Sequence, residues 1–532
     1  MKSFLRVLLF PDSRYKNWIF LGIILLISFV YQYQKVLDLE PQAMHSWRQA
    51  DCASLAYGFI EESNPLEPQM HNQLGDDFTS GRSAGEFTGL YYVVGKLWAL
   101  FGHHNWIFRL VVMLIFFASL FRIFKSLCRH VDQFWAYVVS LTLFTSPLIV
   151  FYANNFLSNV PSLSFAILGC AVYLDYRADG KLKQWIWITL FFTLAGLLKV
   201  TGLVGFLAIG GAEFLLYIFK KQQRFGWKEI LVSCIGVGVV YSWYKYAGYY
   251  NGVHGGKYTF NDLWPIWKMS TEQIDRAISF FNEITFFQLL SIPGYLIFLS
   301  AIIYLLFRFK SFSLDLKLFT IFSLVGFTLY LLFWFNAVEH HDYYFINVLL
   351  FPVITLIGFV FTLKKNEKLF TKKWLRVTTG VLMIFSVIYT SNNFAMRYQD
   401  HINLNKGLAN RIATQKERGY WAWMADDDYQ DVHFKMDSVL LSYGISREDK
   451  VVSLPDPSFN ISLYNMNRKG WTAYGYNMER SEVLEEKIAK GAKYLIYADG
   501  KDADLSPIRD YLNDTVGVYK NATIFRLSSR EE

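Results

Sequence analysis

Long apolar runs separated by short polar segments dominate the chain through residue 392. A helix needs about 20 apolar residues to cross the hydrocarbon core of a membrane, and about eleven runs approach that length. They cover residues 17–36, 107–127, 134–152, 158–176, 184–199, 202–220, 229–247, 286–308, 316–337, 342–362 and 375–392. The pattern predicts a polytopic α-helical membrane protein.

The composition agrees with this interpretation. Only 18% of the 532 residues are charged and 53% are hydrophobic, whereas a soluble protein carries about 25% charged residues. The net charge of +8 is assigned to basic cytoplasmic loops, because membrane proteins concentrate Lys and Arg on that side. No nucleic-acid partner is therefore expected.

Basic residues recur in alternate loops, which predicts an orientation. The basic loops contain Arg122, Lys125 and Arg129; Arg177, Lys181 and Lys183; Lys220, Lys221, Arg224 and Lys228; Arg308, Lys310 and Lys317; and Lys364, Lys365, Lys368, Lys372, Lys373 and Arg376. The intervening loops are poor in charge or acidic. We expect a plasma (inner) membrane protein in contact with membrane lipids, with a cytoplasmic N-terminus and an extracytoplasmic C-terminus.

The longest polar segment between apolar runs is the first external loop, residues 37–106. A loop of this length is usually functional. Its last part, residues 88–102, is apolar but short and contains Lys96, which favours a helix lying at the membrane interface.

The composition changes again after the last apolar run, so the expected domains are 1–394, including the first loop, and a soluble extracytoplasmic domain, 395–532. Residues 451–454 and 494–497 are typical of short buried strands. Residues 481–490 favour a helix capped by Ser481, and a hairpin is expected around Lys520. The second domain is therefore predicted to be a small α/β domain.

Three charged side chains in the first loop are candidates for chemistry: Asp51, Arg48 and Glu86. A carboxylate at Asp51 could act as a general base on an acceptor hydroxyl, although Asp is also favoured at the start of a helix. Arg48 could pair with Asp51 or hold a phosphate. Glu86 could be a second acid, a metal ligand or a solvated surface charge.

Two basic residues depart from the charge rule, because Arg109 and Lys199 lie at external ends of predicted spans. Such side chains can simply extend to the interface. They can also bind an anionic ligand, and a lipid-linked phosphate would suit them.

Another external turn contains Glu339-His340-His341-Asp342-Tyr343-Tyr344. Its ligand types suit a transition metal, but their spacing is not specific for zinc. The candidate ligands are Glu86, His340 and His341, with structural polar contacts as the alternative. The cofactor is therefore left open: a divalent metal is compatible with the sequence but not required by it.

Four motifs resemble those of the GT-C glycosyltransferases, in the branch that contains protein O-mannosyltransferases and lipid A aminoarabinose transferases. Residues 86–92, Glu-Phe-Thr-Gly-Leu-Tyr-Tyr, are similar to that family's Glu-Lys-Pro-Pro-Leu-x-Tyr. Phe101-Gly102 with Arg109, the Lys199 turn, and His341-Asp-Tyr-Tyr344 with Pro352 are similar to three further family segments.

Two positions depart from the family pattern. The family often has Asp-Glu at the start of the first-loop helix, where this chain has Arg48-Gln49, and Asp51 follows one helical turn later. Residues one turn apart share a helix face, so the carboxylate can serve the same cavity. Asn159 stands where the family often has Asp, which weakens the expectation of a metal.

The resemblance implies a GT-C-like membrane enzyme that transfers a sugar from a polyprenyl-phosphate donor to an envelope acceptor, which could be a glycan, a lipid or a protein. Asp51 would be the base, while Arg109 and Lys199 would stabilise the leaving phosphate. Glu86, His341 and Tyr344 would line the cavity. The alternative is a transporter or flippase of lipid-linked sugars, which predicts inverted repeats and charges at the membrane midplane.

Overall fold

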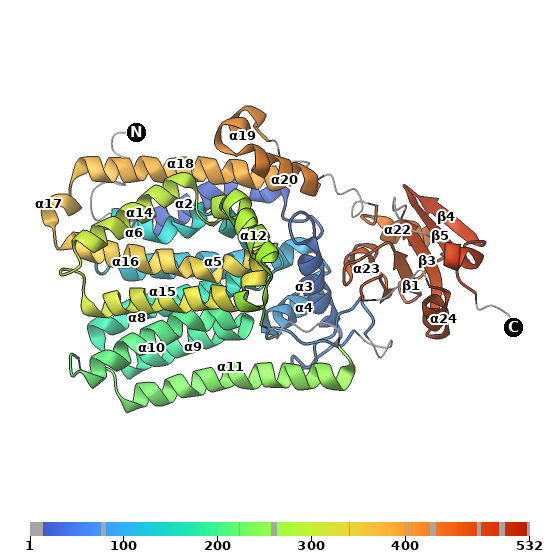
Figure 1. Cartoon of the computed structure of the whole chain (residues 1–532), viewed down its shortest axis with the longest axis horizontal. Coiled ribbons are helices and arrows are strands. Elements are labelled where there is room, and N and C mark those ends of the chain that lie inside the picture. The colour runs from blue at the N-terminus through green and yellow to red at the C-terminus, as the bar shows by residue number, and fades with distance from the viewer. Residues whose placement is uncertain are drawn as a thin grey trace. The chain divides into compact units, whose positions relative to one another are not determined.

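The structure is a computed structural model of the chain (Figure 1). It describes residues 14–75, 81–222, 224–256, 263–339, 341–398, 401–402, 404–425, 432–475, 480–498 and 506–528. The chain forms two compact units. The helical unit comprises residues 1–37, 109–243 and 262–420, and the loop–sheet unit comprises 38–108, 244–261 and 421–532.

Helices of very different lengths build the helical unit, and the long apolar ones run alongside one another in Figure 1. In chain order they are α2 (Lys16–Val30), α5 (Asn105–Leu127), α6 (Gln133–Leu141), α7 (Pro147–Ala153), α8 (Asn159–Asp179), α9 (Leu182–Leu198), α10 (Leu203–Ile218), α11 (Trp227–His254), α12 (Thr271–Phe280), α13 (Phe286–Leu289), α14 (Ile292–Phe307), α15 (Leu314–Phe333), α16 (Leu350–Lys364), α17 (Glu367–Phe370), α18 (Lys373–Arg397), α19 (Lys406–Ile412) and α20 (Gln415–Ala425). Many of their large apolar side chains are exposed, among them Trp18 at 74% and Phe307 at 86%. Such a surface suits lipid rather than water. The protein is a polytopic helical membrane protein.

Among the described helices, six are long and apolar enough to cross a membrane, or seven if one bent pair counts as a span. The predicted run 134–152 is divided because Ser146 caps a new helix and Pro147 begins it. The run 286–308 is also divided: residues 271–289 and 292–307 meet at an angle of 88°. The total of about eleven spans stays a prediction.

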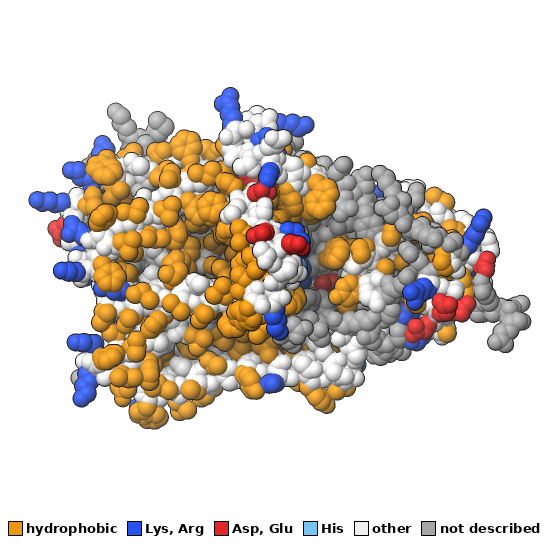
Figure 2. Space-filling view, viewed as in Figure 1, with side chains coloured by type: hydrophobic (Ala, Val, Ile, Leu, Met, Phe, Trp, Pro, Cys, Tyr) orange, Lys and Arg blue, Asp and Glu red, His pale blue; other side chains and the backbone are white. Residues whose placement is uncertain are grey.

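Charge is distributed unevenly over the helical unit. On the face seen in Figure 2, hydrophobic side chains cover most of the unit, and Lys and Arg gather at the end where α17 lies in Figure 1. A basic end of this kind is typical of the cytoplasmic side of a membrane protein. The predicted orientation is thus consistent with the structure but stays a prediction.

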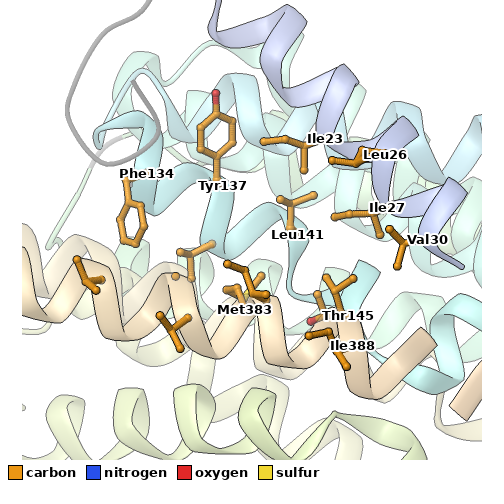
Figure 3. A pocket seen from close by; sticks show the side chains of 16 residues that line it. Ile23, Leu26, Ile27, Val30, Phe134, Tyr137, Leu141, Thr145, Met383 and Ile388 are labelled. Atoms are coloured by element: carbon orange, nitrogen blue, oxygen red, sulfur yellow. The ribbon is translucent and has the colours of Figure 1, made fainter. Parts of the chain in front are cut away.

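An apolar groove of about 490 Å³ opens between α2, α6 and α18. Figure 3 shows Ile23, Leu26, Leu141 and Met383 directed into it from these three helices. The lining is almost wholly apolar, so the groove is suited to a hydrocarbon chain.

The first loop belongs to the loop–sheet unit, where it forms α3 (Ser46–Gly58) and α4 (Gly89–Phe101). These two helices pack against each other. A Cβ on Gly95 would lie only 2.4 Å from the Ala56 carbonyl oxygen, so glycine permits this close approach. The helix expected over residues 88–102 is confirmed as α4.

The end of α11 holds this loop in place. The Tyr246 hydroxyl donates to the Leu66 carbonyl at 2.7 Å, and Asn251 exchanges two hydrogen bonds of 2.7 Å with the backbone of Ala84. The predicted span 229–247 therefore continues as a longer helix whose last residues pack with the loop.

A five-stranded sheet forms the core of the C-terminal residues. Its strands are β1 (Lys450–Leu454), β2 (Gly470–Trp471), β3 (Ala492–Ala498), β4 (Thr515–Tyr519) and β5 (Ala522–Arg526), in the order β2-β1-β3-β5-β4. Strand β1 is parallel to both β2 and β3, whereas β5 is antiparallel to β3 and β4. Helices α22 (Met436–Ser442), α23 (Ile461–Met466) and α24 (Ser481–Ala489) accompany the sheet.

The two predicted strands are present as β1 and β3, the predicted helix as α24, and the predicted hairpin as β4 and β5. The helix cap differs, because Arg480 precedes the helix and Ser481 is its first residue. The described residues 401–420 pack with the helical unit rather than with the sheet. The division of the chain into separate domains at residue 394 stays a prediction.

Candidate active site

Asp51 lies inside α3 and not at its start, because the helix begins at Ser46. Helix capping, the structural alternative for this residue, is therefore excluded. Asp51 is 5% exposed. Burial raises the pKa of its carboxyl to about 7, where Arg48 opposes the shift and Glu86 and Asp456 add to it. The carboxyl can therefore exchange a proton near neutral pH.

Arg48, one turn before Asp51, pairs with Glu86. The Arg48 Nη2 donates to both carboxylate oxygens of Glu86, at 2.6 and 2.7 Å, and both side chains are buried. The Tyr91 hydroxyl donates to Glu86 as well. Glu86 is therefore a buried, charge-paired residue and not a solvated surface charge.

Asp51 differs from Glu86 in its hydrogen bonding. Its buried Oδ1 has no hydrogen-bond partner among the described residues. A buried carboxylate oxygen without a donor is costly, because buried polar groups are almost always paired. Since such exceptions gather at functional sites, Asp51 is the strongest candidate for contact with a substrate hydroxyl.

Arg109, in the helical unit, does not extend to the surface. It is 0% exposed, its Nη1 donates to the Asn154 carbonyl at 2.6 Å, and its guanidinium lies 4.5 Å from the Phe156 ring centroid. The alternative in which this side chain merely reaches the interface is wrong for Arg109. Its planar group is held rigidly beside the amide-rich turn that follows α7.

Lys199 ends α9 in an extended conformation, before the short helix η3 (Val200–Gly202). The side chain is partly exposed. Asn347 ties this turn to its surroundings by donating to the Thr201 hydroxyl at 2.7 Å and to the Ser162 hydroxyl at 3.3 Å. A partly exposed ammonium on an anchored turn is suited to bind an anion.

His341 and Tyr344 flank a second buried network in the helical unit. The His341 ring contacts the rings of Tyr343 and Tyr344, at centroid distances of 5.6 and 5.9 Å. Between them, buried Asp342 accepts hydrogen bonds from the Tyr152 hydroxyl at 2.6 Å and from Arg397 at 3.3 Å.

The sequence interpretation did not single out Asp342, Tyr152 and Arg397 as a group. A signal was present, since Asp342 starts one predicted span and Arg397 lies just after another. Two residues of opposite charge at the ends of predicted spans are candidates for a buried ion pair. The pair fixes the His341–Tyr344 turn on α18.

The metal candidates Glu86, His340 and His341 stay a prediction. His340 lies outside the described residues, Glu86 belongs to the loop–sheet unit, and His341 belongs to the helical unit. Within the described ranges, no group of three or more His, Cys, Asp or Glu residues could hold a metal ion. A cation at Glu86 would have to displace the Arg48 guanidinium from both carboxylate oxygens.

Comparisons with known proteins show which solved structures share this architecture. No family model matches the sequence, and no curated protein matches it. Among solved structures, ArnT from Cupriavidus metallidurans bound to undecaprenyl phosphate is similar over 97% of this chain and 99% of its own, with a TM-score of 0.60 and 10% identity. The chain has the GT-C fold. The apo state of the same ArnT gives a TM-score of 0.57 at 12% identity, over 97% and 98% of the two chains.

A second glycosyltransferase has a related fold. The oligosaccharyltransferase of Archaeoglobus fulgidus, tethered to an acceptor peptide, covers 91% of this chain and 70% of its own, with a TM-score of 0.50 and 10% identity. At these identities the comparisons establish the fold.

Proposed function

We propose that this protein is an integral-membrane glycosyltransferase that moves a sugar from a polyprenyl-phosphate donor to an envelope acceptor on the extracytoplasmic face. One observation carries the proposal: a GT-C fold holds Asp51 buried, with a pKa of about 7 and one carboxylate oxygen that no described residue hydrogen-bonds. The lipid-linked donor is supported by the fold-related ArnT, whose structure contains undecaprenyl phosphate.

Asp51 would act as the general base. The acceptor hydroxyl donates its hydrogen bond to Asp51 Oδ1, and its proton passes to the carboxylate as the oxygen attacks the anomeric carbon. A base with a pKa near the working pH combines a useful ionised fraction with enough basicity. Attack opposite the leaving phosphate inverts the anomeric centre.

Arg109 and Lys199 would stabilise the leaving polyprenyl phosphate. Negative charge develops on the phosphate as the glycosidic bond breaks, and fixed cations lower the energy of that charge most when they need no rearrangement. Arg109 meets this condition through its carbonyl and ring contacts. The apolar groove in Figure 3 is suited to a hydrocarbon chain.

Glu86 has a supporting role in this proposal. By neutralising Arg48 it keeps that guanidinium from pairing with Asp51, which would lower the pKa of the base. His341 and Tyr344 are proposed to line the sugar site. The residues present do not require a divalent metal for any of these steps.

The test is sugar transfer by purified protein in detergent, with a panel of polyprenyl-phosphate sugars and mixed envelope acceptors. Donor-dependent release of free polyprenyl phosphate is the expected result. A transporter would release none, because it breaks no glycosidic bond, and would instead move the intact donor across liposomes. That pair of results would contradict the proposal.

A further inference from the structure

The parallel part of the C-terminal sheet has a topological switch point. Strand β1 lies between β2 and β3, so the chain leaves β1 toward one neighbour through α23 and reaches the other through α24. In open α/β sheets, ligands bind outside the carboxyl ends of the strands at such a point. Here these ends are followed by Asp456 after β1 and Tyr474 after β2.

This edge of the sheet lies beside the helix that carries Asp51. Helix α23, which follows the β1 loop, packs on α3. The charge of Asp456 contributes to raising the pKa of Asp51, and the charge of Asp51 contributes to raising the pKa of Tyr474. Residues from the ends of both strands are therefore within electrostatic range of the candidate base, and all belong to the loop–sheet unit.

Hydrogen bonds fix the two parts to each other. Asn72 accepts from the Ser54 hydroxyl on α3 at 3.0 Å and donates to the carbonyls of Leu463 and Arg468 at 3.3 and 3.2 Å. The Leu74 amide donates to the Gly470 carbonyl at 3.0 Å. The first loop thus extends the sheet beside β2, and the strand ends keep a fixed position relative to α3.

The loop after β1 is itself well ordered. Asp456 accepts hydrogen bonds from the Ser458 amide at 2.8 Å and from the Ser462 amide at 3.0 Å. These bonds account for Asp456 as a structural residue. They leave unexplained the buried Oδ1 of Asn460 in the same loop, which has no hydrogen-bond partner in the described part of the chain.

The chemistry of this edge indicates the kind of ligand. Two buried acceptor atoms at this edge, Asp51 Oδ1 and Asn460 Oδ1, have no hydrogen-bond partner among the described residues, and a ligand that donates hydrogen bonds would satisfy both. In its ionised form, Asp51 repels a phosphate or a carboxylate. Tyr474, 36% exposed and in edge contact with Phe459 at 5.1 Å, offers an aromatic surface. Neutral hydroxyl groups on a ring satisfy all three conditions.

We propose that the carboxyl edge of β1 and β2, with Asn460 and Tyr474, is the acceptor site of this enzyme and binds a neutral carbohydrate whose hydroxyl is presented to Asp51. The inference rests on the proposed function and specifies its acceptor: a glycan, and not a peptide or a phosphorylated lipid. Tyr474 would position the acceptor sugar by ring packing, without taking part in proton transfer.

The experiment measures binding before activity, using the full chain in detergent. Neutral oligosaccharides, phosphorylated oligosaccharides and Ser/Thr peptides are immobilised, and binding is compared between wild type, Tyr474→Ala, Tyr474→Phe and Tyr443→Ala. Tyr443 is a matched control, because it is 37% exposed and its hydroxyl donates to Val518 on β4.

The expected result is binding to neutral oligosaccharides that falls at least tenfold in Tyr474→Ala and is retained in Tyr474→Phe and Tyr443→Ala. Where transfer is observed, the KM for the acceptor rises by the same factor, while the KM for the donor and kcat stay within twofold. Binding to no neutral oligosaccharide, preference for peptides or phosphorylated ligands, or equal loss in Tyr443→Ala would overturn the inference. Loss of transfer with intact glycan binding would instead contradict the proposed function alone.

Discussion

Arg48 and Glu86, 38 residues apart in the chain, form a buried ion pair within 2.7 Å. Asp51 lies one helical turn from Arg48, and its Oδ1 receives no hydrogen bond from the part of the chain that the structure describes. A guanidinium next to a carboxylate lowers the pKa of that carboxylate. The pKa of Asp51 therefore depends on whether Arg48 pairs with Asp51 or with Glu86. The pKa of about 7 thus depends on a residue in a different part of the loop.

Removing the charge of Glu86 should therefore change the pH dependence of transfer. In Glu86→Gln the positive charge of Arg48 is no longer neutralised, so the pKa of Asp51 falls. Since the base acts in its ionised form, the acidic limb of the pH–rate profile should move to lower pH by about one unit. The measurement is kcat against pH, with Glu67→Gln as a control on a more exposed carboxylate of the same loop. An acidic limb at the same pH in Glu86→Gln and in wild type would refute the dependence of the Asp51 pKa on Glu86.

Asp51 should lower the stability of the folded protein above neutral pH. Its folded pKa of about 7 exceeds the ordinary 3.8, so the folded state favours the protonated form, and stability is lost as pH rises from about 4 through 7. Asp51→Asn should then be more stable than wild type at pH 8, by up to roughly 4 kcal/mol, and equal to it below pH 4.

Thermal unfolding at both pH values checks this. Asp437→Asn is a control of opposite sign, because hydrogen bonds from Arg447 and Arg468 lower the pKa of Asp437 despite its partial burial. That variant should be less stable at pH 8. If Asp51→Asn were destabilised at pH 8, the carboxylate would be a paired structural group after all.

Lys199 should affect the donor and not the acceptor. A charge-assisted contact to phosphate contributes about 1.5–3 kcal/mol, so Lys199→Ala should raise the KM for the polyprenyl-phosphate sugar or lower kcat by roughly 10- to 100-fold in total. Lys181→Ala is the matched control at the other end of α9, where the lysine is exposed. Equal effects of the two variants would remove Lys199 from the phosphate site.

Asn72 should hold the first loop and the C-terminal sheet together. In Asn72→Ala the buried carbonyls of Leu463 and Arg468 lose a donor, at a cost of about 1–3 kcal/mol in the free energy of unfolding. Limited proteolysis should release the C-terminal residues faster. Asn513→Ala, which removes only an exposed hydrogen bond to Asp510, should behave as wild type.

Much of the fold follows from local pattern. The apolar runs predict helices because a membrane span satisfies its own backbone hydrogen bonds, and β1, β3, α24 and the β4–β5 hairpin follow from alternation and turn residues. Breaks inside runs were not predicted. The division at Pro147 and the bend before α14 depend on caps and packing that a hydropathy pattern does not record.

The sequence identified candidate residues of the site but not which of them form the ion pair. Asp51, Arg48 and Glu86 were identified from charge and motif, yet whether Arg48 pairs with Asp51 or with Glu86 depends on how α3 and α4 pack, which Gly95 permits. The contribution of Asp456 was beyond local reasoning, because more than 400 residues separate it from Asp51. Only the folded loop–sheet unit brings them together.

The most direct test of the central claim is the single-turnover rate of sugar transfer at pH 8 in wild type and Asp51→Asn, with donor saturating. If Asp51 is the base, the rate should fall by about 10²- to 10⁴-fold, while the KM for the donor stays the same and the variant remains folded. A rate for Asp51→Asn within a few-fold of wild type would contradict the account and assign proton transfer to another group.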